Sequence, residues 1–110
     1  MAWLTRDGEV LATAELAETA RDRLRGLFRR PAIEGVLLLA RPVVLHTVGV
    51  ARPVDVAFCD RDLVVLGTIR LAPCRVAMPR AGSRRVLVAE GGAFERWRLV
   101  PGDRLEVEGT

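Results

Sequence analysis

Apolar residues occur along this chain in short groups, and most groups have the length of a β-strand. In residues 9–17 apolar and polar side chains alternate, which is the pattern of a strand with one buried face. Residues 35–40 form an apolar run, which indicates a strand covered on both faces. Strands are therefore predicted at residues 3–6, 9–17, 35–40, 43–50, 54–59, 63–70, 85–90 and 104–108.

Turn residues separate these groups. Asp7-Gly8, between the first two strands, is a strong signal for a two-residue hairpin loop. Proline interrupts the central apolar stretch at Pro42 and Pro53. Many short strands at roughly regular spacing predict a mainly β fold, a single compact antiparallel β-sandwich or barrel that residues 1–110 form as one domain.

One stretch has the periodicity of a substantial helix. Four apolar residues fall on one helical face of residues 19–30, which begin with the capping residue Thr19 and are followed by Pro31. We therefore expect one short helix near residues 19–30, together with a helical turn near residues 93–99. A doubly wound α/β fold would need repeated crossover helices, which the pattern does not contain.

Composition adds few constraints. Half of the 110 residues are apolar. The chain contains 17 arginines, no lysine and 14 acidic residues, which gives a net charge of +3. Basic proteins often bind nucleic acid, but here acidic residues are interspersed and no aromatic platform is present, so this partner is not expected. No apolar run approaches the roughly 20 residues of a membrane span, and no secretion leader is recognisable. A cytoplasmic protein with free thiols at Cys59 and Cys74 is expected.

The polar residues that stand out lie in the apolar stretch 35–60. Asp55 alternates with valines, and a carboxylate in this position is costly unless it is paired or solvated. A salt bridge or a hydrogen bond to a backbone amide is the default interpretation, and a carboxylate facing a ligand is the alternative. Asp55→Asn would separate the two, because a purely functional carboxylate is dispensable for stability.

His46 is the only histidine, and it lies with Thr47 in the predicted strand 43–50. The default for a lone histidine on an apolar face is a satisfied core or boundary residue. Zinc would require three or four ligands, and no spacing motif links the histidine to the cysteines or Asp55. No metal or other cofactor is therefore expected.

The order of these features resembles a small prokaryotic family, the domain of unknown function 192. The resemblance spans roughly residues 14–107. It is carried by the arginine-rich segment ending in RLRGLFRR at residues 23–30, EGVLLL at 34–39, HTVGVARPVDVAF at 46–58 and LVPGD at 99–103.

The resemblance implies a compact β-rich domain with a short helix near its start, and it implies no activity. The chain departs from the family in two places. His46-Thr47-Val48-Gly49-Val50 stands where the family often has Trp-Met-x-Asn-Thr, and Val88 stands where it tends to have glutamate. The positions that match are Gly26, Leu27, Arg30, Gly35, Pro53, Asp55, Phe58, Gly102 and Asp103.

A non-enzymatic binding or accessory role is the function that these observations favour. Any pocket is expected to contain Arg30, His46, Thr47 and Asp55, with Arg30 as the bidentate partner of Asp55. One alternative is a small hydrolase or lyase that uses Asp55 and His46 as acid and base. Another is a self-associating or partner-binding module with an exposed edge strand. The sequence leaves open whether the partner is a small molecule or a protein, and which oligomer forms.

Overall fold

A computed structural model describes residues 2–17, 35–41, 44–47 and 50–109. Within these ranges the chain is mainly β, as predicted, and the expected helix at 19–30 lies outside them. The elements are β1 Ala2–Arg6, β2 Glu9–Ala17, β3 Val36–Leu39, β4 Leu45–His46, β5 Val54–Cys59, β6 Val65–Leu71, β7 Val76–Ala77, β8 Arg85–Glu90, α2 Ala93–Trp97 and β9 Glu106–Gly109.

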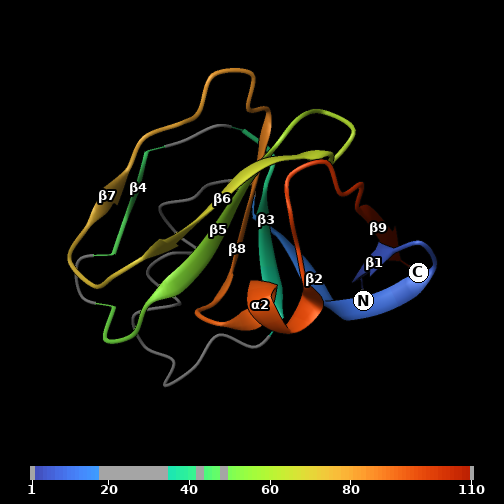
Figure 1. The fold of residues 1–110 in the computed structure, drawn as a ribbon, viewed down its shortest axis with the longest axis horizontal. Helices are drawn as coiled ribbons and strands as arrows, with labels where there is room; N and C mark the ends of the chain where they lie inside the picture. Colours follow the sequence, from blue (N-terminus) through green and yellow to red (C-terminus); the bar gives the residue numbers. More distant parts are fainter. Residues whose placement is uncertain (1, 18–34, 42–43, 48–49, 110) are drawn as a thin grey trace.

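Seven strands form one twisted sheet in the order β6-β5-β8-β3-β2-β1-β9, and β4 pairs with β7 in a second, two-stranded sheet (Figure 1). The sheet departs from the antiparallel expectation at one place, because β2 and β3 run parallel. A parallel pair needs a crossover connection rather than a tight turn, whereas β1 and β2 are joined by the predicted Asp7-Gly8 hairpin. Asp7 and Gly8 both have positive φ, which is the geometry of a type I′ turn.

The central strands are buried on both faces, which explains their nearly continuous apolar sequence. On one face of the large sheet, Val54, Val56 and Phe58 of β5 belong to a cluster that also contains Leu45 of β4 and Ala77 of β7. The two-stranded sheet therefore packs on this face, in a sandwich-like arrangement. Burying a valine, leucine or phenylalanine side chain there contributes about 1.5–3 kcal/mol.

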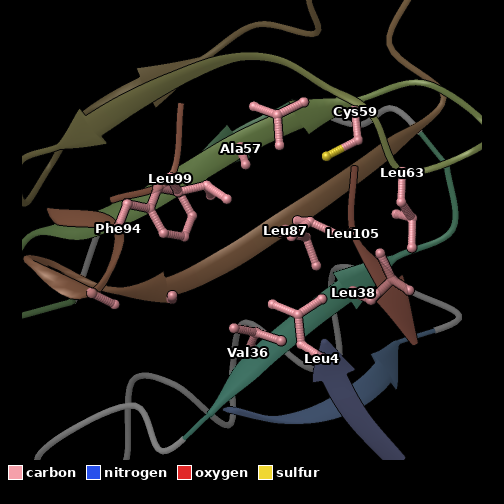
Figure 2. Packing of buried hydrophobic residues seen from close by; sticks show 13 residues of the cluster. Leu4, Val36, Leu38, Ala57, Cys59, Leu63, Leu87, Phe94, Leu99 and Leu105 are labelled. Atoms are coloured by element: carbon pink, nitrogen blue, oxygen red, sulfur yellow. The ribbon is translucent and has the colours of Figure 1, made fainter. Parts of the chain in front are cut away.

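On the other face, the sheet curls around a second cluster (Figure 2). Ala57 and Cys59 of β5 point into it, as the alternation within residues 54–59 predicted. Leu4 of β1, Phe94 of α2 and Leu105 before β9 close it from other elements.

The two edges of the large sheet approach each other but do not close a barrel. Val64, beside β6, forms an isolated antiparallel bridge with Arg104, shortly before β9. The Leu105 N–H donates to the Leu63 carbonyl at 3.0 Å, and the Val65 N–H donates to the Asp103 carbonyl at 2.8 Å.

Candidate functional site

Asp55 is buried near the start of β5, with 3% of its surface exposed. Oδ1 accepts a hydrogen bond from Nε of Arg70 at 3.2 Å. Oδ2 accepts the backbone N–H groups of Gly92 at 2.9 Å and Phe94 at 3.1 Å. The carboxylate thus has a cationic partner and backbone amide partners, the two kinds of contact expected of a structural carboxylate.

The contacts of Asp55 hold α2 against the sheet. A helix begins with N–H groups that lack partners within the helix, and these are usually satisfied by the side chain of the N-cap residue. The N-cap of α2 is Gly92, which has no side chain to do this. Asp55 supplies the missing oxygen from a strand 37 positions earlier in the chain.

Arg70 extends this contact to the surface. Its Nη2 donates to Glu95 at 3.1 Å, so the guanidinium lies between a buried and an exposed carboxylate. Hydrogen bonding and charge from Asp55, followed by the charge of Glu95, raise the pKa of Arg70. The arginine stays cationic and belongs to a fixed ion-pair chain.

An open groove of about 440 Å³ lies beside this chain, between β6 and α2 with the residues after it. Its walls contain charged and apolar side chains in similar measure. The lining residues are Asp55, Thr68, Ile69, Arg70, Phe94, Glu95, Arg98, Leu99 and Val100.

Thr47 and His46 lie elsewhere. Both line a separate cavity of about 10 Å³ that Asp55 does not border, and a space of this size holds at most one water molecule. The Thr47 hydroxyl donates to the Ala72 carbonyl at 2.6 Å and accepts the Arg75 N–H at 2.9 Å, which fastens β4 to the chain after β6. His46 is exposed, although the expected strand pattern placed it on an apolar face.

The expected four-residue pocket is therefore divided in the part of the chain that the structure describes. Asp55 borders the groove, His46 and Thr47 border the small cavity, and Arg30 lies outside the described residues. The partner that the structure gives Asp55 is Arg70, which the sequence analysis did not single out. The contact follows from the register of the sheet, because antiparallel pairing of β5 with β6 sets Asp55 directly opposite Arg70.

The cysteines do not form a reactive pair. Cys59 is fully buried, and burial, assisted by the nearby charge of Asp60, raises the pKa of its thiol to about 12. Cys74 is exposed, and both thiols are free. Among the described residues, no group of three His, Cys, Asp or Glu side chains is arranged to hold a metal ion.

Comparison with known proteins identifies the sequence family and the fold. The model of the family DUF192, described as Uncharacterized ACR, matches residues 2–107. No curated protein is a significant match. Nor does any helix in the described ranges have the length and apolar character needed to cross a membrane.

Two solved structures share the fold. A "putative transcription regulator" from Sinorhizobium meliloti is 24% identical with a TM-score of 0.78, and the match covers 96% of this chain and 91% of that one. A protein of unknown function from Novosphingobium aromaticivorans is 23% identical with a TM-score of 0.77, covering 96% and 82%. At these identities the likeness concerns the fold alone.

Proposed function

The chain belongs to the DUF192 family, whose description carries no activity, and we propose from its geometry that it is a non-enzymatic binding protein. In this proposal the groove between β6 and α2 receives an extended segment of a partner protein. The observation that carries the proposal is the outer edge of β6 along this groove, which no other strand covers in the part of the chain that the structure describes.

β6 is the last strand of the large sheet. Within the described ranges, the backbone bonds on its outer edge are those of Val65, with Gly102 and Asp103. Residues 68–70 border the groove instead of another strand. An extended polypeptide laid along them would add a strand to the sheet, a recurrent mode of peptide recognition.

The groove walls indicate the chemistry of that segment. Ile69 and Val100 expose 38% and 52% of their surfaces and offer apolar contact. Arg98 is exposed on the opposite wall and has no ion pair among the described residues. A segment with an apolar side chain and a carboxylate would match this combination.

The contacts of Asp55 do not favour the hydrolase or lyase alternative. Its two oxygens already accept three hydrogen bonds, and His46 borders a different cavity. An acid–base pair must be within hydrogen-bond reach of the same proton or connected through one water. We also place the protein in the cytoplasm as part of this proposal, a location with which two free thiols agree.

Photo-crosslinking in cells tests the groove. A benzophenone amino acid in place of Ile69 is expected to capture one partner, whose crosslinked segment is then identified by mass spectrometry. The same amino acid in place of Val10, which is 55% exposed on β2, serves as the matched control and should not capture it.

A synthetic peptide of the captured segment should then bind the native chain. Ile69→Asp should weaken binding about tenfold or more, which corresponds to about 1.4 kcal/mol, and Val10→Asp should leave it unchanged. Equal capture at both positions, or equal affinity of both variants, would refute the groove as the binding site.

A further inference from the structure

The two-stranded sheet carries a second surface, separate from the groove. Leu45 pairs with Ala77, and both are buried against the large sheet with exposed fractions of 2% and 5%. His46 pairs with Val76, and this pair faces outward. Because side chains alternate along a strand, the flanking residues Val44 and Met78 share this outward side.

The outward side is unusually apolar for an exposed surface. Val44, Val76 and Met78 expose 50%, 60% and 67% of their surfaces. We call this set, together with His46, the β4–β7 face. Apolar side chains that gather on one exposed face, rather than being scattered singly, are typical of an interaction site.

The chain segments that form and flank the β4–β7 face carry arginines and no acidic residue. Residues 35–54 and 63–89 contain no aspartate or glutamate. Exposed arginines flank the strands of the β4–β7 face in sequence, namely Arg41 and Arg52 around β4 and Arg75 and Arg80 around β7.

Four exposed acidic side chains lie at the opposite end. In Figure 1, β4 and β7 occupy one end of the long axis, and β1 and β9 with both termini occupy the other. The exposed residues Asp7, Glu9, Glu106 and Glu108 belong to this second end, in the β1–β2 hairpin and β9. An acidic partner is therefore attracted to the exposed arginines beside the β4–β7 face.

We infer that the β4–β7 face is the docking surface for an acidic, amphipathic segment of another protein. Apolar side chains of that segment would cover Val44, Val76 and Met78, and its carboxylates would meet the flanking arginines. Methionine and arginine are enriched in the centres of protein interfaces.

Other anionic partners fit this face less well. A single nucleic-acid strand is usually held by aromatic stacking, and residues 35–54 and 71–89 contain no aromatic ring besides His46. Membrane surfaces are usually anchored by tryptophan or tyrosine at the interface, and neither occurs in these segments. An acidic protein segment uses both the apolar side chains and the arginines.

A phage-displayed library of random linear peptides is a suitable probe. Selection on the native chain, with counter-selection on the Val76→Asp/Met78→Asp double variant, should enrich peptides that combine acidic and apolar residues. Both positions are exposed, so the double variant should fold, which its urea unfolding curve verifies.

Purified peptides from the selection are then measured by titration. Affinity should fall about tenfold or more for the double variant and for Arg75→Glu, and should stay unchanged for Val10→Asp at the far end and for Ile69→Asp in the groove. Higher salt should weaken binding, because exposed charges are screened.

Three results would overturn the inference. The first is the absence of acidic enrichment, or selected peptides that bind the double variant as well as the native chain. The second is binding of duplex DNA, or of vesicles of phosphatidylcholine and phosphatidylglycerol, that the double variant loses. The third is salt-sensitive self-association in sedimentation that the double variant abolishes, which would make a second copy the occupant. Loss of the Ile69 crosslink would leave this inference unaffected, because it concerns the other surface.

Discussion

At the scale of single residues, Asp55 connects three parts of the molecule. Its carboxylate joins β5 to Arg70 on β6 and to the first turn of α2. This candidate site residue therefore holds α2, one wall of the groove, against the sheet. In this role it accepts the Phe94 N–H and holds Arg70, which in turn donates to Glu95.

Asp55→Asn is expected to lower the free energy of unfolding by about 2–4 kcal/mol, because charge-assisted bonds are lost and an amide donor faces two N–H groups. Urea unfolding followed by circular dichroism measures the change. Asp62→Asn, at an exposed turn position, is the matched control and should stay within about 0.5 kcal/mol. Equal effects of the two substitutions would contradict the structural role of Asp55.

The buried thiol of Cys59 predicts a stability change at alkaline pH. Its pKa rises from the ordinary 9.0 to about 12 in the folded chain, so the folded state binds this proton more tightly than the unfolded state. The contribution is complete below pH 9 and is lost as the pH rises toward 12, with a slope of up to about 1.4 kcal/mol per pH unit.

The chain suits this measurement because it contains no lysine or tyrosine. Unfolding free energies between pH 8 and 11 should fall for the native chain and for Cys74→Ala, and should fall much less for Cys59→Ala. A native slope that survives in Cys59→Ala would show that another group is responsible.

At the scale of elements, the sequence predicts a strand well where turn residues and alternation together define its bounds. The bounds expected for β5 and β8 agree with the structure residue for residue. The strand expected at 43–50 is shorter, with β4 covering Leu45–His46 in the described part. Both of its faces are largely apolar, so alternation alone does not say which side turns inward.

Register, too, does not follow from the alternation of apolar and polar residues. The sequence therefore favours Arg30 as the partner of Asp55, whereas the structure places Arg70 on β6 opposite it. A β-bulge in β2 is another feature that alternation does not predict. Leu4 pairs with Ala12 and Thr5 with Val10, so Leu11 is the extra residue. Val10, expected on the buried side, is consequently 55% exposed, and Leu11 packs against the core.

The contact between β2 and β3 depends on a glycine. Gly35 has φ +74°, and a Cβ atom there would overlap the side chain and carbonyl of Thr13. Gly8 has a similar φ of +81°, but a Cβ atom there would meet no atom within 4 Å. Any other residue would therefore pay the cost of a left-handed backbone at both positions, but its Cβ atom would clash with neighbouring atoms only at position 35.

Gly8→Ala should cost about 1–2 kcal/mol of unfolding free energy, the penalty of a left-handed residue. Gly35→Ala should cost at least about 2 kcal/mol more, because the added methyl group forces β2 and β3 apart. Thermal and urea unfolding of the pair provide the comparison. Similar costs would mean that β3 has room to move away from Thr13.

At the scale of the whole molecule, contacts between β6 and the segment before β9 join the two edges of the large sheet. Besides the bridge near Val64, Arg6 of β1 donates to Asp103 at 3.0 Å and to the Trp97 carbonyl at 2.6 Å. Leu105 is 1% exposed in the core between the two edges. The backbone bridge and the Leu105 side chain therefore hold the two edges together near Val64 and Arg104.

Leu105→Ala should lower stability by about 2–5 kcal/mol, because it leaves a cavity where the edges meet. Hydrogen exchange should accelerate at the amides of Val65 and Gly102, whose bonds connect the edges. Val100→Ala, 52% exposed, is the control and should alter neither measurement. Unchanged exchange at Val65 in Leu105→Ala would show that the bridge holds without this side chain.

The strand order has a further consequence for synthesis on the ribosome. β3 lies between β2, made just before it, and β8, made long afterwards, with Val36 paired to Ala89. During translation the strand edge of β3 that pairs with β8 therefore stays unpaired until β8 has been synthesised, and β3 consists of four apolar residues. Such late, long-range pairing slows folding and leaves an aggregation-prone strand exposed in the nascent chain.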